Sequence, residues 1–412
     1  MSLAAMLFVV PAIAQVTTSS ISGHVTDKDG AVAGVAVIAV YQPTATAFYA
    51  VTDKNGNYRI NNITAGGPYT VSFQMMGYRE IENKGVYAPL AETAVVDATM
   101  EDESISLQGV VLVADANDSG MNIRRSGAGT SVSQRTMSNM PTVSRSMNDI
   151  MKLTPQASTT SNGLAIGGGN YRSSYVTVDG AAFNNAFGIG GNLPAGGAPI
   201  SLDAIEQMSV NITPFDVRHS GFTGGAINAV TKSGTNEFHA SVYDYYTSDK
   251  VRGYKVEGTD LNRTDMLDNT VGFTIGGPIV KNKLFFFVNA EYTSDVVAGS
   301  TKVVSDASGR VDPAFVPNTD VVRPTKEFME QVLDVLQTKY NYNPGRYQGY
   351  SLSTPDYKIM ARLDWIINRD NKLNLRVSHT HTMNSNTPSS SVNPISPNPY
   401  DRNVYGRTST YA

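Results

Sequence analysis

The feature that most constrains this chain is an alternation of apolar and polar residues that recurs after residue 236. In one segment apolar side chains occupy every second position and charged ones lie between them: Tyr357, Ile359, Ala361, Leu363 and Trp365 alternate with Lys358, Arg362 and Asp364. Successive side chains of a strand point to opposite faces, so the alternation predicts strands with one apolar and one polar face. Outer-membrane barrel strands have this pattern with the apolar face outward, although a soluble sandwich would show the same alternation.

The lengths of the connections favour the barrel over the sandwich. Short turns alternate with long connections along the chain: turns at 281–283 and 368–371, and connections at about 249–269, 297–354 and 385–402. Outer-membrane barrels have short periplasmic turns and longer external loops. We therefore predict the first five to six strands of an antiparallel transmembrane β-barrel over residues 236–412, with a helix over 325–340 in the second long loop.

The N-terminus has the form of an export signal. Residues 1–14 hold an apolar stretch that ends in Pro11 and a small-x-small triplet, Ala12-Ile13-Ala14, which is typical of a cleavable secretory signal. A buried N-terminal strand is the alternative. The chain has no Cys and a formal net charge of −4. These values argue against a disulfide scaffold and a cysteine metal site, and they give no basic footprint for nucleic acid.

Residues 15–103 are predicted to form a small β-sandwich. Short alternating segments are separated by turn sequences such as DKDG at 27–30 and TDKNGN at 52–57, and short strands bounded by turns are typical of an all-β domain. The pieces SGHVTDKDGAVAGVAV, TDKNGNYRI and YTVSFQMMGY resemble the carboxypeptidase regulatory-like domain, a transthyretin-like sandwich. The module of that family is not catalytic. The sequence has no HExxH motif, and His24 stands alone.

Residues 104–113 form a candidate tether between the sandwich and the next domain. Its β-prone part consists of Leu107, Gln108, Gly109, Val110, Val111, Leu112 and Val113. One interpretation is a further edge strand of the sandwich. The other is a segment that pairs with the sheet of a partner, because an exposed strand offers main-chain donors and acceptors. By position the segment resembles the TonB box of TonB-dependent receptors, with Gly109 where that family often has Glu.

Residues 114–235 mix helix-like and strand-like stretches and are predicted to form an α+β plug domain. Apolar spacing predicts a helix between Pro141 and Pro155, and Leu202, Ile205 and Met208 suggest a short helix that runs into a strand. The ordered motifs RSSYVTVDG, SLDAIEQMSV and FDVRHSGFTGGAINAVTKSGTNEFHAS resemble the plug-to-barrel junction of TonB-dependent receptors, in the Oar-like and SusC-like branch. The whole chain is thus expected to be mainly β, with a sandwich, a plug and barrel strands in that order.

The resemblance implies a receptor in the outer membrane, with the sandwich and the plug on the periplasmic side. TonB and its inner-membrane energising complex would capture the tether and pull on the plug, so that a glycan, a peptide, a metal chelate or a similar ligand is imported. The other implied partners are outer-membrane lipids and, as is common in the SusC-like branch, a surface lipoprotein. The mechanism implies no catalytic residue, no metal and no cofactor, so the protein is not expected to be an enzyme.

Two plug loops, at 163–170 and 181–199, are expected to face the ligand or the pore. Their candidate ligand-facing residues are Asn170, Tyr171, Arg172, Phe183, Asn184, Asn185 and Phe187. Asp179 and Gly180, which lie between the two loops, are expected to hold a turn of the plug rather than to touch a ligand.

Two other functions are compatible with parts of the sequence. An Oar-like adhesion or secretion-linked surface protein would share the whole architecture without importing a nutrient. A periplasmic enzyme accessory would account for the sandwich, but the strand alternation and the loop lengths count against it.

The length of the chain bears on its completeness. A plugged outer-membrane barrel has about 22 strands, and an open sheet in lipid would leave backbone groups unpaired at its edges. About five strands and the start of a sixth near Val404 fit into residues 236–412. We therefore expect the chain to be the N-terminal fragment of a longer receptor.

Overall fold

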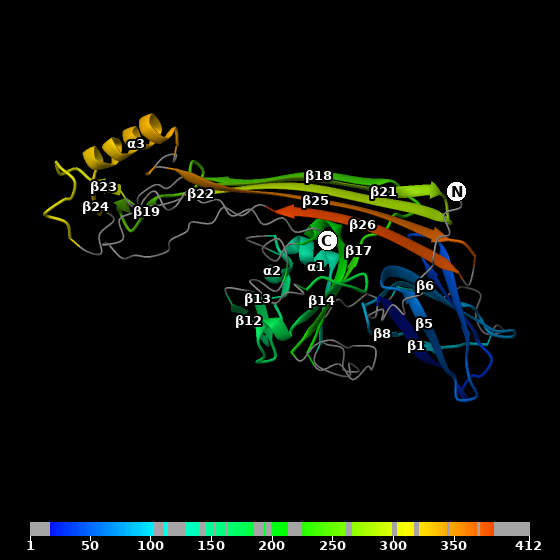
Figure 1. Ribbon diagram of the computed structural model, residues 1–412. Helices are drawn as coiled ribbons and strands as arrows, with labels where there is room; N and C mark the ends of the chain where they lie inside the picture. The colour runs from blue at the N-terminus through cyan, green and yellow to red at the C-terminus, as the bar shows by residue number, and fades with distance from the viewer. Residues whose placement is uncertain are drawn as a thin grey trace, which may run out of the picture.

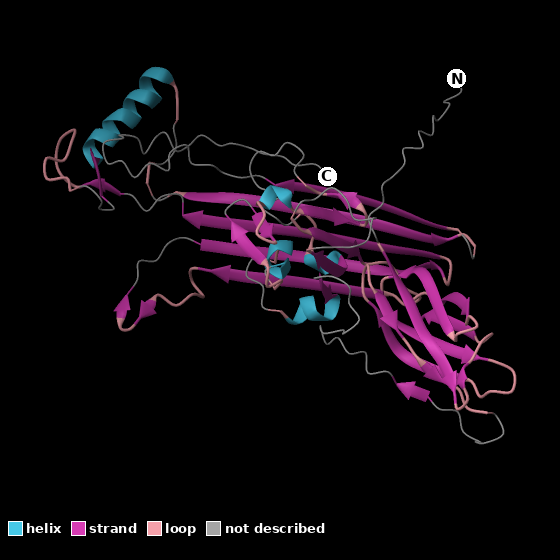
Figure 2. Cartoon of the chain, turned by 90° about the horizontal axis from the view of Figure 1, so that it is seen from below, coloured by secondary structure: helices cyan, strands magenta, loops and turns pink. Residues whose placement is uncertain are grey.

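The computed structural model has a mainly β fold made of a sandwich, a plug and one long antiparallel sheet (Figures 1 and 2), so the expected fold class is confirmed. It describes residues 17–382 except 103–110, 114–128, 141–144, 152, 161–162, 185–192, 194–198, 213–223, 261–265, 299–302, 317–320, 344–346, 349 and 369–370. The predicted signal at 1–14 and the strand near Val404 lie outside these residues. No helix in the described part is long and apolar enough to cross a membrane.

The first domain consists of two sheets packed on one core. In one sheet β1 pairs with β2, β5, β8 and β9, and the other has the order β10-β7-β6-β3-β4. The strands are β1 (Thr18–Asp27), β2 (Gly30–Ala31), β3 (Ala36–Tyr41), β4 (Thr46–Val51), β5 (Asn57–Thr64), β6 (Gly66–Gln74), β7 (Ile81–Ala88), β8 (Thr93–Val95), β9 (Ala98–Thr99) and β10 (Val111–Val113). Alternate residues of β1 and β6, such as Ile21, Val71 and Phe73, are fully buried between the sheets, as expected where two sheets share a core.

Gly23 of β1 lies against Tyr58 of β5 and against Val96, in the segment between β8 and β9. A β-carbon at this position would lie 1.9 Å from the carbonyl oxygen of Val96 and 2.9 Å from the Tyr58 ring. We expect Gly23→Ala to force β1 away from β8 and to destabilise the sandwich by about 3 kcal/mol, the upper end of the usual cost of overpacking. The measurement is the rate of trypsin cleavage within residues 17–102 of the intact chain. Gly253→Ala is the control, because nothing lies within 4 Å of an added β-carbon there; equal cleavage rates for the two variants would contradict the prediction.

The DKDG turn is held by hydrogen bonds to the Asp27 carboxylate. Asp27 accepts a hydrogen bond of 2.6 Å from the Tyr78 hydroxyl and bonds from the backbone N–H groups of Asp29 and Gly30 at 2.8 and 2.9 Å. These donors, Tyr78 first, hold the pKa of the Asp27 carboxyl below its ordinary value. A depressed pKa stabilises the fold above the unfolded pKa, and this contribution is lost as pH falls through the folded pKa.

We therefore expect Tyr78→Phe to raise the pKa of Asp27 toward its ordinary value and to narrow the acid range over which the sandwich loses stability. Carboxyl ¹³C NMR titration of Asp27 is the measurement. Tyr340→Phe, at an exposed ring outside the sandwich, is the control and should leave the titration unchanged. An Asp27 titration that is the same in Tyr78→Phe as in the parent would show that the hydroxyl has no influence.

The second domain is a sheet with short helices around it. The sheet has the order β11-β16-β17-β14-β15, and a separate hairpin is formed by β12 and β13. The elements are β11 (Gly129–Ser133), α1 (Gln134–Asn139), α2 (Met147–Met151), β12 (Ala157–Thr160), β13 (Gly163–Ile166), η2 (Tyr171–Ser173), β14 (Tyr175–Val178), β15 (Ala181–Ala182), η4 (Leu202–Ala204), β16 (Ile205–Asn211) and β17 (Ala226–Thr231). Its core joins residues of these elements to Phe287 and Met360 of the long sheet.

Two predicted helices of the plug are wrong in extent. Between Pro141 and Pro155 the only helix in the described residues is α2, which ends at Met151. Two turns follow it, in which the Leu153 N–H donates to the Ile150 carbonyl and the Thr154 N–H donates to the Met151 carbonyl. The residue before a proline is disfavoured in the helical region, so Pro155 limits any continuation. The expected helix through Ile205 and Met208 is a single turn, η4, and these two residues belong to β16. β16 is an interior strand of the plug sheet, and both of its faces are largely buried. Its apolar residues therefore follow from burial on both faces of a strand and not from a helix.

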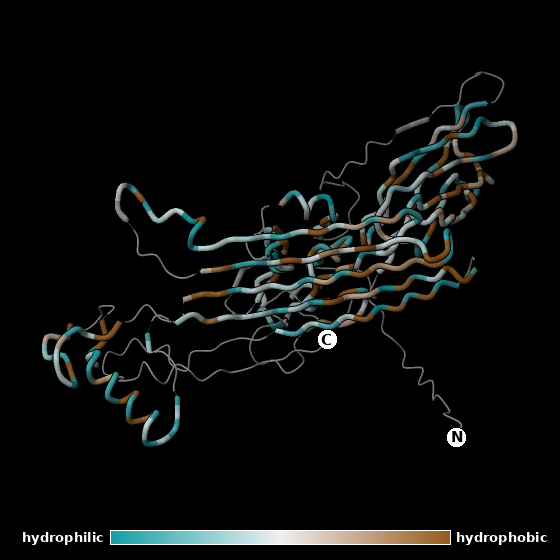
Figure 3. The backbone as a smooth tube through the Cα atoms, turned by 90° about the horizontal axis from the view of Figure 1, so that it is seen from above, coloured by the Kyte–Doolittle hydropathy of each residue, from teal (hydrophilic) through white to brown (hydrophobic). Residues whose placement is uncertain are grey.

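The third part is a sheet of five long antiparallel strands in the order β18-β21-β22-β25-β26. They are β18 (His239–Ser248), β21 (Met266–Val280), β22 (Leu284–Ala298), β25 (Ser351–Ile366) and β26 (Lys372–Thr382). On one face Ile359 and Val377 are 50% and 63% exposed, whereas on the plug-facing side Glu291 and Lys358 are each 6% exposed. The predicted apolar-outward, polar-inward arrangement is therefore confirmed, and Figure 3 shows apolar and polar residues interspersed along these strands.

The two ends of the long sheet differ, as the loop lengths predict. The β21–β22 and β25–β26 connections are short, and the long connections carry β19 (Lys255–Val256), β20 (Thr259–Asp260), β23 (Val303–Ser305), β24 (Val321–Thr325) and α3 (Lys326–Tyr340). The helix is capped by the Thr325 hydroxyl, which accepts from the Phe328 N–H. The sandwich lies at the short-turn end and α3 at the opposite end, with the plug against one face of the sheet between them (Figure 1).

Candidate functional site

The most extensive polar contact between the plug and the long sheet is centred on Asp179. We call Asp179, Thr231, Arg362, Asp364 and Arg376 the Asp179 cluster. The Asp179 carboxylate accepts from the backbone N–H and the hydroxyl of Thr231, at 2.9 and 2.7 Å, and it lies 3.5 Å from Arg362 Nη1 and 3.3 Å from Arg376 Nη1. Thus one plug carboxylate faces two guanidinium groups of β25 and β26.

Arg362 completes this cluster by binding both domains at once. Its Nη1 donates to the carbonyl and the hydroxyl oxygens of Thr231, at 2.8 and 3.0 Å, and its Nε and Nη2 donate to the Asp364 carboxylate. The Ser233 hydroxyl donates to Asp364 at 2.6 Å. A planar guanidinium with several fixed donors suits this role, because it satisfies a carboxylate and a carbonyl simultaneously.

A second cluster lies further along the same face. We call Ser201, Tyr243, Glu291, Asp356 and Lys358 the Glu291 cluster. The Ser201 and Tyr243 hydroxyls donate to Glu291 Oε2 at 2.7 and 2.9 Å, and Lys358 Nζ lies 2.9 Å from Glu291 Oε1 and 3.1 Å from Asp356 Oδ2. Ser201 is the plug's contribution, so here a plug hydroxyl binds a carboxylate that already has a lysine partner.

Tyr243 reaches this cluster because its neighbour on β21 has no side chain. It pairs with Gly272, and a β-carbon there would lie 2.4 Å from the Tyr243 ring. A third contact lies close by, where Arg145 of the plug forms an ion pair with Asp203 and lies over the rings of Tyr243 and Tyr245, at 5.5 and 3.9 Å from their centroids. At each of these three places the plug meets the sheet through charged, hydroxyl or aromatic groups.

Two further charges, Glu206 and Lys232, lie where β16 begins and β17 ends. Burial raises the pKa of the Glu206 carboxyl, and the positive charges of Lys232 and Arg362 oppose that shift. Burial lowers the pKa of the Lys232 amine, and Glu206 and Asp203 oppose that shift. Each group thus offsets part of the other's loss of solvation, which is how buried charges are usually accommodated.

The structure separates the ligand-facing candidates into two groups. Asn170 and Arg172 are exposed, and the Asn170 side chain accepts from the Arg172 N–H at the start of η2, while Arg172 lies over the Tyr171 ring. This turn follows β13, which lies on the side of the plug away from the sandwich (Figure 1).

The second group is engaged in packing and hydrogen bonds. Phe183 is 7% exposed, and Arg376 lies 5.5 Å from its ring centroid. The Asn184 side chain accepts from Val176 N–H and donates to the Ser174 carbonyl, and so extends β14. Asn185 and Phe187 lie outside the described residues.

The candidate TonB box is described only in its last three residues. Val111–Val113 form β10, which pairs in parallel with Glu82, Asn83 and Lys84 of β7 at the edge of a sandwich sheet. Leu107, Gln108, Gly109 and Val110 lie outside the described residues. The interpretation of this stretch as an edge strand of the sandwich therefore holds for Val111–Val113.

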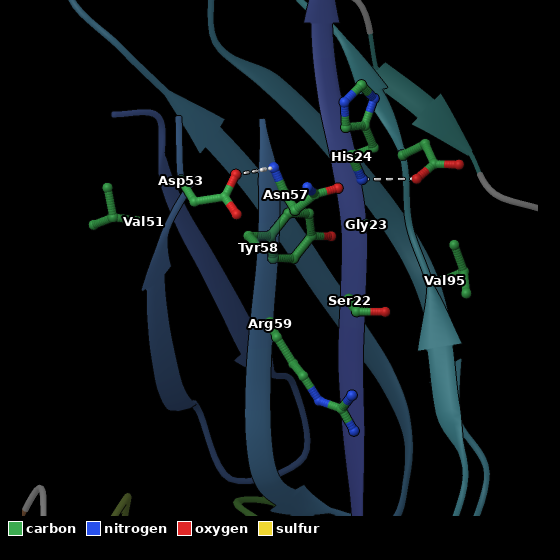
Figure 4. A pocket seen from close by; sticks show the side chains of 10 residues that line it. Ser22, Gly23, His24, Val51, Asp53, Asn57, Tyr58, Arg59 and Val95 are labelled. Carbon is green, nitrogen blue, oxygen red and sulfur yellow. Dashed lines mark hydrogen bonds between the residues drawn. The ribbon is translucent and has the colours of Figure 1, made fainter. Parts of the chain in front are cut away.

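The sandwich also carries an open hollow of about 490 Å³ lined by residues of β1, β4, β5 and β8 and of the neighbouring loops (Figure 4). Several of its polar groups form hydrogen bonds within the sandwich. The backbone N–H of His24 donates to the Asp97 carboxylate, and the His24 ring lies 2.9 Å from the Asn55 carbonyl. The Asp53 carboxylate accepts from the N–H groups of Asn55 and Asn57. No group of three or more His, Cys, Asp or Glu side chains in the described part of the chain is placed to hold a metal ion.

The alternation in β25 predicts that its charged residues lie on the polar face of the sheet, but it does not predict which residues they contact. Asp179 was expected to hold a turn, and it does adopt a left-handed backbone with φ of 48°. Its second role, as the partner of Arg362 and Arg376, depends on contacts across more than 180 residues of sequence. The available signal was the presence of Lys358, Arg362 and Asp364 inside a sheet, because buried charges need partners.

Two family profiles match the chain. Residues 20–101 match the carboxypeptidase regulatory-like domain, and residues 230–411 match the outer membrane β-barrel domain. Among curated proteins, the chain is 27% identical over 366 residues to the TonB-dependent transporter Oar of Myxococcus xanthus, covering 84% of this chain and 32% of Oar. It is 29% identical over 188 residues to the probable TonB-dependent siderophore receptor PirA of Acinetobacter baumannii, covering 44% of this chain and 23% of PirA.

The crystal structure of the siderophore receptor PirA from Acinetobacter baumannii matches with a TM-score of 0.41 and 19% identity, covering 63% of this chain and 32% of PirA. The chain thus spans about a third or less of the length of the curated relatives that it matches. The order of its matched domains agrees with the order of the sandwich and the long sheet in the structure. The chain is therefore a homologue of the TonB-dependent transporter Oar, with a carboxypeptidase regulatory-like domain ahead of an outer membrane β-barrel domain.

Proposed function

We propose that this chain acts in TonB-dependent import across the outer membrane, by a plug that is pulled from its seat on the barrel wall. The observation that carries the proposal is the chemistry of that seat. Asp179, Ser201 and Thr231 meet Arg362, Arg376 and Glu291, around a small apolar contact with Phe287 and Met360. Polar groups can exchange their partners for water when the plug moves, so their loss costs far less than exposing a large apolar surface.

The orientation follows from the same proposal. Asn236, at the start of the barrel part, bonds to Asn282 in the short β21–β22 turn. The sandwich lies at this end of the sheet, and short turns are periplasmic in outer-membrane barrels. The sandwich and the plug entrance would then face the periplasm, and α3 would lie outside the cell. The exposed turn at Asn170–Arg172 would be reached by a ligand that enters from that outer side.

The test, made in the receptor with its whole barrel, is the replacement of Leu107–Val113 by a Gly/Ser segment of equal length, which keeps the length of the tether and removes its β-prone side chains. We expect binding of the purified periplasmic domain of TonB to be lost and energised uptake to stop, while the protein remains in the outer membrane. Siderophores loaded with ⁵⁵Fe are the first uptake probes, because the relative PirA is named a siderophore receptor; labelled oligosaccharides and peptides are the next.

The control is a Gly/Ser replacement of Asp306 to Asp312, a segment of seven residues in the β23–β24 connection at the opposite end of the sheet, which should leave TonB binding unchanged. Retained uptake together with lost cell adhesion in the tether variant would favour an Oar-like adhesion or secretion-linked role instead. Retained TonB binding in that variant would refute the assignment of the tether.

A further inference from the structure

The sandwich is docked onto β16, an interior strand of the plug sheet, through one buried side chain. Gln207 of β16 is fully buried, and its Oε1 accepts a hydrogen bond of 2.8 Å from the backbone N–H of Leu90, itself fully buried just after β7. Gly66, the first residue of β6, lies beside the same glutamine: a β-carbon there would be 3.4 Å from Gln207 Nε2. With a φ of +113°, Gly66 adopts a backbone that favours glycine. The contact is therefore close as well as buried.

The sandwich also contacts the rim of the barrel. The Asn236 N–H donates to the Pro43 carbonyl at 2.8 Å, and the Asn236 side chain is bonded to Asn282 in the β21–β22 turn. At the next short turn, Lys372 Nζ lies 4.2 Å from the centroid of the Phe48 ring. Both contacts come from the β3–β4 hairpin of the sandwich. The hairpin therefore spans two neighbouring turns of the sheet.

These contacts join the plug to the barrel by a second route, in addition to the Asp179 and Glu291 clusters. Movement of the plug along the barrel must break either the contact between Leu90 and Gln207 or the contacts of Pro43 and Phe48 with the rim. Both are made by a few polar or cation–π contacts. Each such contact contributes only a small free energy, so the connection can open when a pulling force is applied to it.

The tether pairs with the strand that leads to this docking point. Val111–Val113 pair with Glu82–Lys84 of β7, and β7 ends at Ala88, two residues before Leu90. A pull on the tether is thus applied to the strand that leads directly to the contact with Gln207.

We infer that the sandwich is an intramolecular brace, docked at once on β16 of the plug and on the short turns of the barrel, and that the plug leaves its seat only after one of these two attachments opens. The inference rests on the proposed function, since it concerns a plug that moves. Its structural part, the double attachment, is independent of any transport.

The absence of cysteine from the chain allows a crosslinking test in outer membranes. The pair Pro43→Cys and Asn236→Cys joins the sandwich to the barrel, and the pair Leu90→Cys and Gln207→Cys joins it to the plug. We expect mild oxidation to join both pairs as disulfides in the resting protein; a bulkier reagent would not reach the buried positions 90 and 207. Met76→Cys with Asn236→Cys is the control and should not link, since Met76 is 98% exposed beyond the far end of β6, roughly 30 Å from Gly66 at strand spacing.

The same pairs test the brace. Either link alone leaves the other attachment free to open, whereas both links together fix the plug to the rim. Hydrogen exchange of β16 amides in moderate urea should slow at least about tenfold with both links and less than about twofold with either alone, because exchange reports local opening. Equal protection by one link and by two, or no linking in the resting protein, would overturn the inference. Failure of TonB binding with normal linking would instead count against the proposed function.

Discussion

Replacing Asp179 by Asn is expected to lower the free energy that holds the plug against the sheet by about 3 kcal/mol, because breaking a partly buried ion pair leaves the Arg376 charge uncompensated. Asn tolerates the left-handed backbone at this position, so the turn itself should survive. What is lost is the negative charge that faces Arg362 and Arg376 at 3.5 and 3.3 Å. The measurement is the urea midpoint at which the amides of β17 lose protection from hydrogen exchange, with the protein in lipid.

Arg376→Gln provides the second half of a double-mutant cycle. Because Arg376 has Asp179 as its ion-pair partner, the two substitutions together should cost less than the sum of each alone, by about 1 kcal/mol or more. Asp29→Asn, at an exposed turn of the sandwich, is the matched control and should leave the midpoint of β17 in place. Strictly additive effects would mean that the two side chains do not stabilise each other.

Lys358→Met should destabilise the sheet and the plug seat together, by about 3–5 kcal/mol, the usual effect of removing one partner from a buried ion pair. Lys358 is 6% exposed and lies between Glu291 and Asp356, at 2.9 and 3.1 Å. Without it two carboxylates remain close together with no cation between them. The measurement is the temperature at which the protein loses its folded mobility in outer-membrane fractions.

Glu291→Gln added to Lys358→Met should restore part of this loss, since removing both charges of a buried pair is far less costly than removing one. The amide of Gln can still accept from the Ser201 and Tyr243 hydroxyls that now bind Glu291. Lys255→Met in β19, at an exposed position, is the control. If the double variant were less stable than Lys358→Met, Glu291 would have a stabilising role independent of the lysine.

The long sheet was predictable because its signal is local. The alternation with a period of two in residues 357–365 predicts a strand with one polar and one apolar face. The turn at 281–283 is recognisable as a short polar segment between two such strands. The plug was less predictable. The spacing of Ile205 and Met208 fits a helix, yet β16 is an interior strand of its sheet and buried on both faces, and a strand of that kind need not alternate.

The partners of the charged residues were not predictable at all from local patterns. Arg362 and Asp179 are far apart in sequence, and their contact depends on how β14 and β17 lie against β25. The same holds for Gln207, whose partner is a backbone N–H of another domain. A single sequence shows that a buried charge or amide needs a partner, but the identity of that partner is set by the tertiary arrangement.

The first strand of the sandwich has a consequence for how the domain is made. β1 pairs in parallel with β8 and β9, so Ser20 lies opposite Thr93 and Val25 opposite Ala98. Contacts this distant in sequence form slowly, since a long loop must close before they contribute any stability. During synthesis the sheet around β1 stays incomplete until residue 99 has followed it. An exported chain benefits from that delay, because the domain remains unfolded, and therefore able to thread through a narrow pore, until its last strands have emerged on the far side.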